Sequence, residues 1–540
     1  MIVLGIGGST HDFSACLVVD GVVAVAVEEE RLSRIKHHSL EQLAIGEFRL
    51  RAVDYCLDAL DLTLGDVDVI VANDLVHRGA LRGLRDVRKV DHHLSHAALV
   101  SYLCPDPDLA LLVIDGFGSM KSNEAEIVSY FVAGNDRWPR LVHREYGAVR
   151  RLDPSRPFSW KNFDVVDDSL GELYSWVTRR IGFGLHDEGK TMGLAPLGSD
   201  ALTEQLQETV RLDSIGGVRF DATTRAALDE LMPIPPEQGE DWCVRADYAR
   251  AAQDLLELAL LRRANDLCDR TGARNIGLGG GVFLNSAANR RILREGPFSG
   301  IALHGATGDS GTAIGAALLA YADMTGRTPE PGVVVYTGRE YDDRQIRDEL
   351  QQTSGIEWHE GDPTDRAARA LATGQIVGWF QGGSEFGPRA LGNRSILADP
   401  GAAGMKDRIN RVVKHRESFR PFAPSVLIER QAEVLDSATE GFFMCVNAQV
   451  RPEILNRLEC ATHIDGSARY QSVGPETNIR YHRLMTRFAE ITGTPALLNT
   501  SFNDSEPIVE TPKEALASFL RTDIDCLAIG DHFVTKTGAQ

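Results

Sequence analysis

Three histidines in one short stretch, His92, His93 and His96, are the residues with the clearest potential for chemistry. If they open a helix, the 3.6-residue turn places His92 and His96 on one face, where two imidazoles can bind the same metal ion. His93 is an alternative to His92, because residues three positions apart also share a face. A single histidine near an apolar helix is usually structural, but three so close together favour a divalent metal.

We expect a carboxylate to complete this metal site, and Asp115 is the best candidate. The apolar run 109–115 predicts a buried strand that ends at Asp115, and the glycines at 116 and 118 predict a tight turn after it. Asp309 lies in a second glycine turn that opens a predicted helix over 312–322, where it either caps the helix or reaches the metal. Histidine and aspartate ligands together suit iron, zinc or manganese rather than magnesium.

Length and composition limit the classes of protein to which the chain can belong. A chain of 540 residues predicts two or three domains, and its net charge of -20 opposes a role as a general nucleic-acid binder. The eight cysteines show no Cys-x-x-Cys spacing, so we expect reduced thiols in a cytoplasmic protein rather than a zinc ribbon or a disulfide framework. Neither a signal peptide nor a membrane span is expected.

A repeated pattern of strands must position these candidates. Residues 2–27 predict three strands, with a tight turn at Asp20 and Gly21, and the first strand ends in glycines that resemble a phosphate-binding turn. The same order recurs around Asp115, with strands over 109–115, 126–133 and 140–147 and a turn over 134–136. This repeat predicts an α/β fold with a duplicated actin-like ATPase core, although two unrelated β-meanders would look alike.

The middle of the chain is predicted to be mostly helical over 155–260, with one helix capped by the polar residues at 167–169. Glu188 and Lys190 lie between glycines and predict a phosphate or adenylate contact, the alternative being a solvated loop. The glycines at 279–281 let the backbone approach a flat ligand such as adenosine. The aromatic residues of this region are Phe158, Trp160, Phe163, Tyr174, Trp176 and Phe183. Most of them are expected in the core, and some are expected to line a pocket.

A Pro- and Gly-rich linker over 324–335 precedes a second domain, which carries the densest cationic cluster of the chain, over 387–395 and 414–424. Arginine and lysine side chains among apolar residues suit the oxyanions of phosphate or carboxylate. Arg469 and the hydroxyl and amide side chains of 498–503 add further donors. The pattern predicts a small, multiply charged substrate bound beside a nucleotide.

Six motifs recur along the chain: His-Asp-x-Ser-Ala at 11–15, Glu-Glu-Glu-Arg-Leu-Ser-Arg-x-Lys at 28–36, His92-x-x-x-His96, Gly-Lys-Thr-Met-Gly-Leu-Ala at 189–195, Gly-Pro-Arg-Ala-Leu-Gly-Asn-Arg at 387–394 and Ser-Phe-Arg-Pro-Phe-Ala-Pro at 418–424. Over nearly the full length they resemble the O-carbamoyltransferases of antibiotic and nodulation-factor biosynthesis.

The resemblance implies two domains. Residues 1–335 would be an actin-like carbamoyl-transfer domain similar to the tRNA threonylcarbamoyl transferase, and 336–540 a YrdC-like domain that forms carbamoyl adenylate from carbamoyl phosphate and ATP.

The resemblance also implies roles for individual residues. It makes His11 the catalytic base and His92, His96, Asp115 and Asp309 the ligands of Fe(2+) or a similar divalent metal. The cationic cluster would bind carbamoyl phosphate, and also ATP with its Mg2+. Lys414 and Arg420 would be the catalytic residues of this cluster. The residues expected to contact these co-substrates are Lys36, Glu188, Lys190, Gly279, Gly280, Gly281, Arg389, Arg416, Arg469, Ser501 and Asn503.

The expected partner is a small hydroxylated natural product. We expect no nucleic-acid partner and no membrane partner, and a homodimer is one of the possible oligomeric states. A tRNA threonylcarbamoylation enzyme built from the same two domains is one alternative, which the acidic charge opposes. An adenylate-binding regulatory protein without activity is another, which the complete set of metal-ligating and cationic candidates opposes. The acceptor itself cannot be named from the sequence.

Overall fold

The computed structural model describes residues 1–39, 50–103, 106, 108–133, 138–151, 164–235, 242–332, 334–417 and 419–538. They form two compact units, one of Met1–Glu29 with His37–Gly332 and one of Glu30–Lys36 with Val333–Gln540. The division falls close to the predicted boundary at 335, but the sequence did not predict that the segment 30–36 belongs to the second unit. The predicted turn at 134–136 and the residues Cys104, Phe158, Trp160, Phe163 and Ser418 lie outside the described residues.

The first sheet of the first unit begins with an antiparallel meander of β1 (Ile2–Gly7), β2 (Ser14–Val19) and β3 (Val22–Glu28). On its other side β1 pairs in parallel with β4 (Val69–Asn73), which pairs in parallel with β5 (Arg88–Val90). The turn between β2 and β3 has φ values of 50° at Asp20 and 90° at Gly21, the left-handed conformation that an Asp-Gly hairpin requires. The three predicted strands are confirmed.

The second sheet repeats this order. It has an antiparallel meander of β6 (Leu109–Ile114), β8 (Glu124–Ala133) and β9 (Pro139–Arg151), and β6 pairs in parallel with β11 (Asn275–Gly279), which pairs in parallel with β12 (Gly300–Leu303). Two short strands, β7 (Met120–Lys121) and β10 (Asp164–Val166), extend it. Identical strand orders and directions confirm the predicted duplicated actin-like core.

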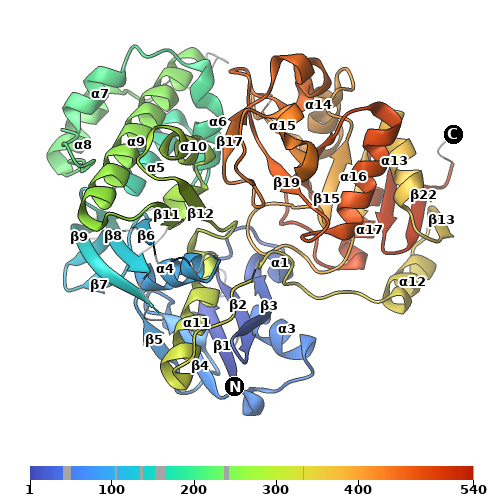
Figure 1. The fold of residues 1–540 in the computed structure, drawn as a ribbon, viewed down its shortest axis with the longest axis horizontal. Helices are drawn as coiled ribbons and strands as arrows, with labels where there is room; N and C mark the ends of the chain where they lie inside the picture. The colour runs from blue at the N-terminus through green and yellow to red at the C-terminus, as the bar shows by residue number, and fades with distance from the viewer. Residues whose placement is uncertain are drawn as a thin grey trace. The chain divides into compact units, whose positions relative to one another are not determined.

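Two helices, α4 (His92–Leu103) and α11 (Thr312–Thr325), pack against each other between the two sheets, with α11 on the first sheet and α4 on the second (Figure 1). A Cβ atom on Gly315 would lie only 1.8 Å from the carbonyl oxygen of Ser95, so glycine is required where the helices meet. Cβ atoms on Gly5 and Gly7 would lie 2.2 and 2.4 Å from backbone atoms of Ala313. The glycines of the first strand therefore serve helix packing, and phosphate binding by the turn that follows stays a prediction.

The rest of the first unit is mostly helical in its described middle part, as predicted. Its helices are α1 (Glu29–Ser33), whose end belongs to the second unit, α3 (Arg51–Ala59), α5 (Leu170–Ile181), α6 (Glu188–Leu194), α7 (Thr203–Thr209), α8 (Ala222–Leu231), α9 (Trp242–Thr271) and α10 (Ser286–Glu295). Short 3-10 turns are η1 (Leu64–Asp66), η2 (Arg78–Leu81), η3 (Ala195–Leu197), η4 (Gly281–Leu284) and η5 (Asp309–Gly311). Ser169 caps α5 by accepting from the amide of Glu172, as the polar residues before the helix predicted.

The second unit is built on a mixed eight-stranded sheet in the order β13-β22-β21-β14-β15-β20-β16-β19. Its strands are β13 (Ile356–Glu360), β14 (Val377–Phe380), β15 (Arg394–Ala398), β16 (Ala423–Leu427), β19 (Gln471–Val473), β20 (Ala496–Ser501), β21 (Cys526–Ile529) and β22 (His532–Lys536). A separate ribbon pairs β17 (Asn447–Gln449) with β18 (Ser467–Arg469). This is the α/β architecture expected of a YrdC-like domain.

Two apolar cores flank the eight-stranded sheet. One contains side chains of α12 (Asp343–Gln352), α14 (Met405–Ile409) and α17 (Pro512–Arg521), and the other those of α13 (Thr364–Ala372) and α16 (Ile479–Thr492). A π-helical turn, η6 (Asn410–Lys414), follows α14, and such turns often occur at functional sites. The remaining short elements are α15 (Gln431–Val434), η7 (Ile428–Arg430), η8 (Pro452–Arg457) and η9 (Glu459–Ala461).

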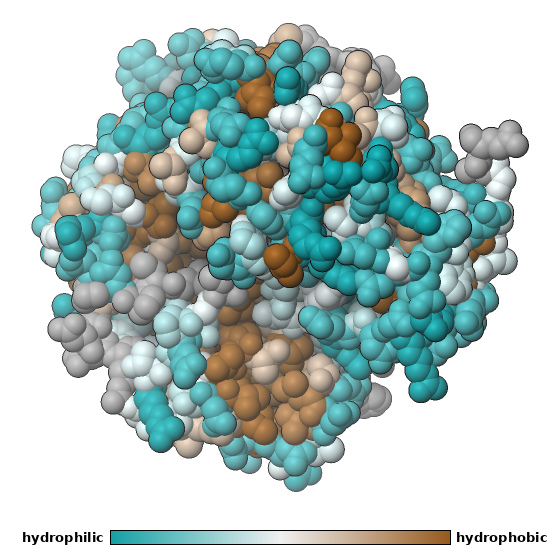
Figure 2. Space-filling model, turned by 45° about the vertical axis from the view of Figure 1, so that its right-hand side comes forward, coloured by the Kyte–Doolittle hydropathy of each residue, from teal (hydrophilic) through white to brown (hydrophobic). Residues whose placement is uncertain are grey.

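The surface is mainly polar. Figure 2 shows polar side chains over most of the visible face, with apolar side chains gathered in a patch low in the view. None of the helices that the structure describes is both long and apolar enough to cross a membrane. The seven cysteines in the described part of the chain are all free thiols.

Candidate functional site

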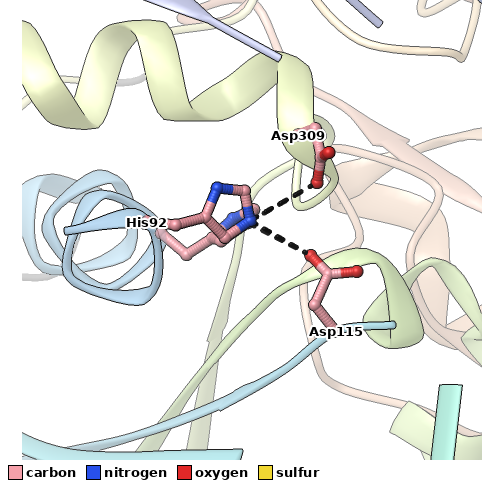
Figure 3. A group of neighbouring side chains, drawn as sticks. His92, Asp115 and Asp309 are labelled. Carbon is pink, nitrogen blue, oxygen red and sulfur yellow. Dashed lines mark hydrogen bonds and ion pairs between the residues drawn. The ribbon is translucent and has the colours of Figure 1, made fainter. Parts of the chain in front are cut away.

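The four predicted metal ligands come together in the first unit from three elements. His92 and His96 lie one turn apart on α4, Asp115 directly follows β6, and Asp309 begins η5. Figure 3 shows His92, Asp115 and Asp309 pointing toward one another. The Nε2 atoms of the two histidines are 3.1 Å apart, His96 Nε2 is 3.2 Å from Asp115 Oδ2, and His92 Nε2 is 3.6 Å from Asp309 Oδ1. One atom from each of the four residues lies within 4.8 Å of all the others.

The chemistry of this four-residue cluster fits a divalent cation. Both histidines are buried, and the buried Oδ2 atom of Asp115 has no hydrogen-bond partner despite its closeness to both rings. A buried acceptor without a partner is costly, and a cation between the four side chains would satisfy it. Burial and the charge of Asp115 raise the pKa of Asp309, so the two carboxylates also repel each other. Two imidazoles and two carboxylates are ligands that zinc, iron or manganese accept.

Contacts behind the cluster fix the orientation of His92. Its Nδ1 atom lies 3.3 Å from the side-chain oxygen of Asn73, whose amide nitrogen donates to the carbonyl of Gly8 at 2.8 Å and to Thr312 Oγ1 at 2.7 Å. This contact leaves Nε2 directed at the cluster, as in many metal-binding histidines. Burial opposes protonation of His92, but Asp115 and Asp309 outweigh it and raise its pKa to about 9. Sequence reasoning missed Asn73, although a polar residue ending an apolar strand was a usable signal.

Two alternatives for this cluster are wrong. His93 does not replace His92, because its Nδ1 atom lies 2.8 Å from Ser129 Oγ and the ring faces Glu126. Asp309 does not cap the helix that follows it, since no side chain caps η5 or α11. Its carboxylate is directed at the histidines instead.

The glycines at 279–281 border the cluster. A Cβ atom on Gly280 would lie 2.1 Å from the carbonyl oxygen of Ile114, and one on Gly281 would lie 3.1 Å from Asp115 Oδ1. Gly280 also has a φ of 99°, which favours glycine. These glycines therefore let the end of β11 approach the turn that carries Asp115. Their contact with adenosine stays a prediction.

Glu188 and Lys190 belong to the first turn of α6, so the alternative of a solvated loop is wrong. Glu188 accepts a hydrogen bond of 2.6 Å from Ser175 Oγ, and Lys190 Nζ lies 3.0 Å from Asp187 Oδ2. Both side chains are partly exposed. Their contact with a nucleotide stays a prediction.

His11, the predicted base, lies on the turn between β1 and β2. Its Nδ1 atom is 2.9 Å from Asp12 Oδ2, and its ring centroid is 4.2 Å from that of His186. Burial lowers the pKa of His11, but Asp12 and, more weakly, Asp309 and Asp115 raise it to about 9. The charge of the four-residue cluster therefore acts on His11. As long as no cation neutralises the two carboxylates of the cluster, the imidazole of His11 is protonated at neutral pH.

The second unit brings the predicted residues Lys414, Ser501 and Asn503 together. Lys414 ends the π-helical turn, and its buried Nζ atom donates to the carbonyl oxygen of Ser501 at 2.6 Å and to Asn503 Oδ1 at 2.6 Å. It also lies 3.1 Å from Ser501 Oγ and 2.9 Å from the carbonyl of Asn503. Burial lowers the pKa of Lys414 well below its usual value, and the positive charges of Arg416, Lys36 and Arg420 add to this effect.

Four predicted arginines add positive charge to this part of the second unit. Burial and the charge of Arg420 together lower the pKa of Arg416 to about 9, and Arg416 also lies over the ring of Phe422, 4.3 Å from its centroid. Burial, together with neighbouring arginines, also lowers the pKa values of Arg389 and Arg469. Such mutual repulsion indicates a cluster in which positive charge exceeds negative charge. A bound anion would relieve the repulsion.

The segment 30–36 supplies Lys36 to this cationic cluster. Arg31 donates to the carbonyl of Gly387 at 2.7 Å, and Arg34 to those of Pro507 and Ile508 at 2.6 and 2.8 Å. These contacts place 30–36 in the second compact unit, whereas the predicted domain of 1–335 includes the segment. Glu385, which sequence reasoning missed, accepts from the amides of Leu391, Asn393 and Arg394 and so shapes the Arg389 loop.

Two family models match this chain. The model described as "Carbamoyltransferase N-terminus" matches residues 75–318, and the one described as "Carbamoyltransferase C-terminus" matches residues 368–536. Among solved structures, HypF of T. kodakarensis covers 61% of this chain and 49% of its own at 14% identity, with a TM-score of 0.40. A likeness this distant adds nothing to the fold, which rests on the strand order.

Similar curated proteins extend over most or all of the chain. The nodulation protein NolNO of Sinorhizobium fredii is 36% identical over 98% of this chain and 80% of its own length. The nodulation protein NolO of Bradyrhizobium diazoefficiens is 39% identical over 69% of this chain and 70% of its own. The 3'-hydroxymethylcephem-O-carbamoyltransferase of Streptomyces clavuligerus is 34% identical over 59% of each. From the two family models and these relatives together, the chain belongs to the carbamoyltransferase family.

Proposed function

We propose that this chain is an O-carbamoyltransferase that makes carbamoyl adenylate in its second unit and transfers the carbamoyl group to a hydroxyl of a small secondary metabolite in its first. The observation that carries this proposal is the pair of different centres, a four-residue cluster with the ligand set of a divalent cation and a cationic cluster whose members repel one another. Membership of the carbamoyltransferase family supports the group transferred. The name of the cephem relative supports a hydroxyl acceptor.

The cationic cluster suits the first half-reaction. Carbamoyl phosphate, ATP and water would give carbamoyl adenylate, inorganic phosphate and pyrophosphate, so several phosphate groups must lie together before the bonds change. Lys414, Arg420 and Arg469 would neutralise these groups, with Lys36, Arg389 and Arg416 beside them. Charge-assisted contacts to phosphate are among the strong hydrogen bonds in proteins. Ser501 and Asn503 would position the lysine, because both accept its hydrogen bonds.

The four-residue cluster and His11 suit the second half-reaction. The acceptor hydroxyl would attack the carbamoyl carbon, the bond to the adenylate oxygen would break, and AMP would leave. His11 would take the hydroxyl proton on Nε2 while Asp12 holds Nδ1. A divalent ion such as Fe(2+), held by His92, His96, Asp115 and Asp309, would supply positive charge for the adenylate phosphate. Gly279, Gly280, Gly281, Glu188 and Lys190 are the proposed contacts of the nucleotide.

A coupled assay tests the proposal directly. Pyrophosphate should be released from ATP when carbamoyl phosphate is present, without threonine or bicarbonate. Mass spectrometry of the protein with candidate hydroxylated metabolites should then detect one compound that gains a carbamoyl group. Dependence on threonine and bicarbonate would instead indicate the tRNA-modifying alternative, and the absence of pyrophosphate release would indicate a regulatory protein without activity.

A further inference from the structure

Asp12 occupies an unusual place between two imidazole rings. Its Oδ2 atom lies 2.9 Å from Nδ1 of His11, and its Oδ1 atom lies 2.8 Å from Nδ1 of His37. The backbone of Asp12 has a φ of 53°, in the left-handed region that non-glycine residues rarely adopt, although aspartate and asparagine tolerate it. This conformation directs one carboxylate to both rings. The three residues all belong to the first unit.

His186 lies against both of these rings. Its ring centroid is 4.2 Å from that of His11 and 4.6 Å from that of His37. Burial, with the neighbouring charges of His11 and His37, lowers the pKa of His186 to about 3, so this third ring is neutral. Its backbone φ of 64° is again left-handed. His186 therefore packs the pair in place without adding a charge.

We propose that Asp12 is a positioning residue for His11, and that His37 moderates the basicity of His11 by sharing the same carboxylate. The catalytic part of this inference rests on the proposed function, in which His11 is the base. When Asp12 accepts the Nδ1 proton of His11, the basic atom of that ring is Nε2, which can receive the proton of an acceptor hydroxyl. The imidazolium that forms remains hydrogen-bonded to Asp12. His37 donates to the other carboxylate oxygen and so withdraws part of that stabilisation.

Other charged groups also act on this histidine pair. The carboxylates of Asp309 and Asp115 raise the pKa of His11, and Arg179 is the cation whose charge acts on His186. A cation bound in the four-residue cluster would cancel the effect of Asp309 and Asp115 but not that of Asp12. The pair of contacts to Asp12 is therefore the part of the environment of His11 that does not depend on the metal.

The test is a histidine titration by NMR in chelator-treated protein labelled with 13C at histidine Cε1, with the His11 resonance assigned by its loss in His11→Asn. Asp12→Asn should lower the pKa of His11 by about one unit or more, as expected when an adjacent opposite charge is removed. Asparagine retains the left-handed backbone, so the fold should persist. His37→Phe should shift the pKa of His11 in the opposite direction, upward and by less, because Asp12 then interacts with His11 alone.

A matched control is Asp20→Asn, which also replaces an aspartate with a left-handed φ, 50°, but lies on an exposed hairpin of the same sheet. It should leave the His11 titration unchanged. An unchanged titration in both Asp12→Asn and His37→Phe, or shifts of the same sign in the two, would overturn the inference. These shifts do not require activity, so they stand apart from the proposed function, which fails if the wild-type protein transfers no carbamoyl group.

In an active preparation the same variants should move the pH profile of transfer. A general base acts only when deprotonated, so the rate falls at low pH with the pKa of His11. This acidic limb should shift to lower pH in Asp12→Asn, with a lower maximum because the ring is less well oriented, and to higher pH in His37→Phe. A purely structural role of Asp12 would lower the rate at every pH and leave the limb in place, which would contradict the positioning role.

Discussion

The four-residue cluster of the first unit and the cationic cluster of the second have opposite charge and opposite construction. In the first, two imidazoles and two carboxylates surround one point, and their neighbours, such as Asn73, hold them there. In the second, Lys414 donates to Ser501 and Asn503, while neighbouring arginines destabilise one another's positive charge. The ligand set of the first cluster suits a small cation. The second cluster suits a larger anion that brings its own negative charge.

The two sites should therefore fail independently. Removing a ligand from the four-residue cluster affects what a cation contributes, whereas removing an arginine affects how phosphate groups are held.

The largest effect is expected from His96→Ala. With one of four ligands removed, the protein should lose its bound metal, measured by elemental analysis of the purified protein, and transfer should be abolished. Pyrophosphate release in the second unit should stay within about a factor of two of wild type, because changes at sites with no shared partners act independently. His93→Asn is the matched control, since His93 is buried on the same helix but contacts Ser129 rather than the cluster; it should retain the metal.

A large effect is also expected from Arg420→Ala. Truncating one member of a close charge pair costs on the order of 2–5 kcal/mol, or roughly 30- to 5,000-fold, when the partner charge stays buried. Pyrophosphate release should fall by a factor in this range, while the metal content stays at the wild-type level. Arg430→Ala is the matched control, because both arginines pair with a glutamate three positions away. Arg420 pairs with Glu417, and Arg430 pairs with Glu433. A similar loss of pyrophosphate release in Arg430→Ala would show that the effect is not local.

A comparable effect, confined to transfer, is expected from His11→Asn. Transfer should fall by at least about a hundredfold, the lower end of what a general base contributes, with metal content and pyrophosphate release retained. The wild-type rate of transfer should rise with pH through the neutral range, because Asp12 raises the pKa of His11 and the base must lose its proton. Near-normal transfer by His11→Asn between pH 6 and 8 would remove His11 from the mechanism.

The smallest effect concerns the helix contact that aligns the four-residue cluster. Gly315→Ala places a methyl group 1.8 Å from the carbonyl oxygen of Ser95 on α4, and overpacking of this kind costs about 1–3 kcal/mol. The free energy of unfolding, measured with urea, should fall accordingly. Gly189→Ala is the control, because a Cβ atom there meets no neighbour within 4 Å and alanine is the better helix former. An unchanged stability in Gly315→Ala would mean that α4 and α11 can separate freely.

The sequence predicted the duplicated core from local patterns, and the four-residue cluster from helix periodicity, the glycine turns and the family resemblance. Alternating strands with glycine turns are visible in the chain, and His92 and His96 share a face by helix periodicity alone. It also indicated the cationic cluster, since arginines concentrated in an acidic chain stand out. Of the two roles predicted for Asp309, helix cap and metal ligand, the structure agrees with the second, because it places Asp309 in the four-residue cluster. It also brings Lys414 to Ser501 and Asn503.

Long-range contacts were beyond the reach of the sequence. Nothing in the segment 30–36 indicates that Arg31 and Arg34 bind backbone carbonyls of the second unit, because carbonyl acceptors carry no residue-type signal. The packing role of Gly5 and Gly7 was likewise not visible in the sequence. Glycine permits both phosphate binding and close helix packing, and the packing role depends on the position of α11.

Transfer by Arg420→Ala supplied with synthetic carbamoyl adenylate separates the two half-reactions in a single variant. This variant should form almost no adenylate from ATP and carbamoyl phosphate, yet it should transfer the supplied carbamoyl group to the acceptor at a rate close to that of wild type. Such rescue would place the two half-reactions at the two differently charged clusters. Failure of Arg420→Ala to transfer from synthetic adenylate, in a folded protein that keeps its metal, would contradict the division of labour proposed here.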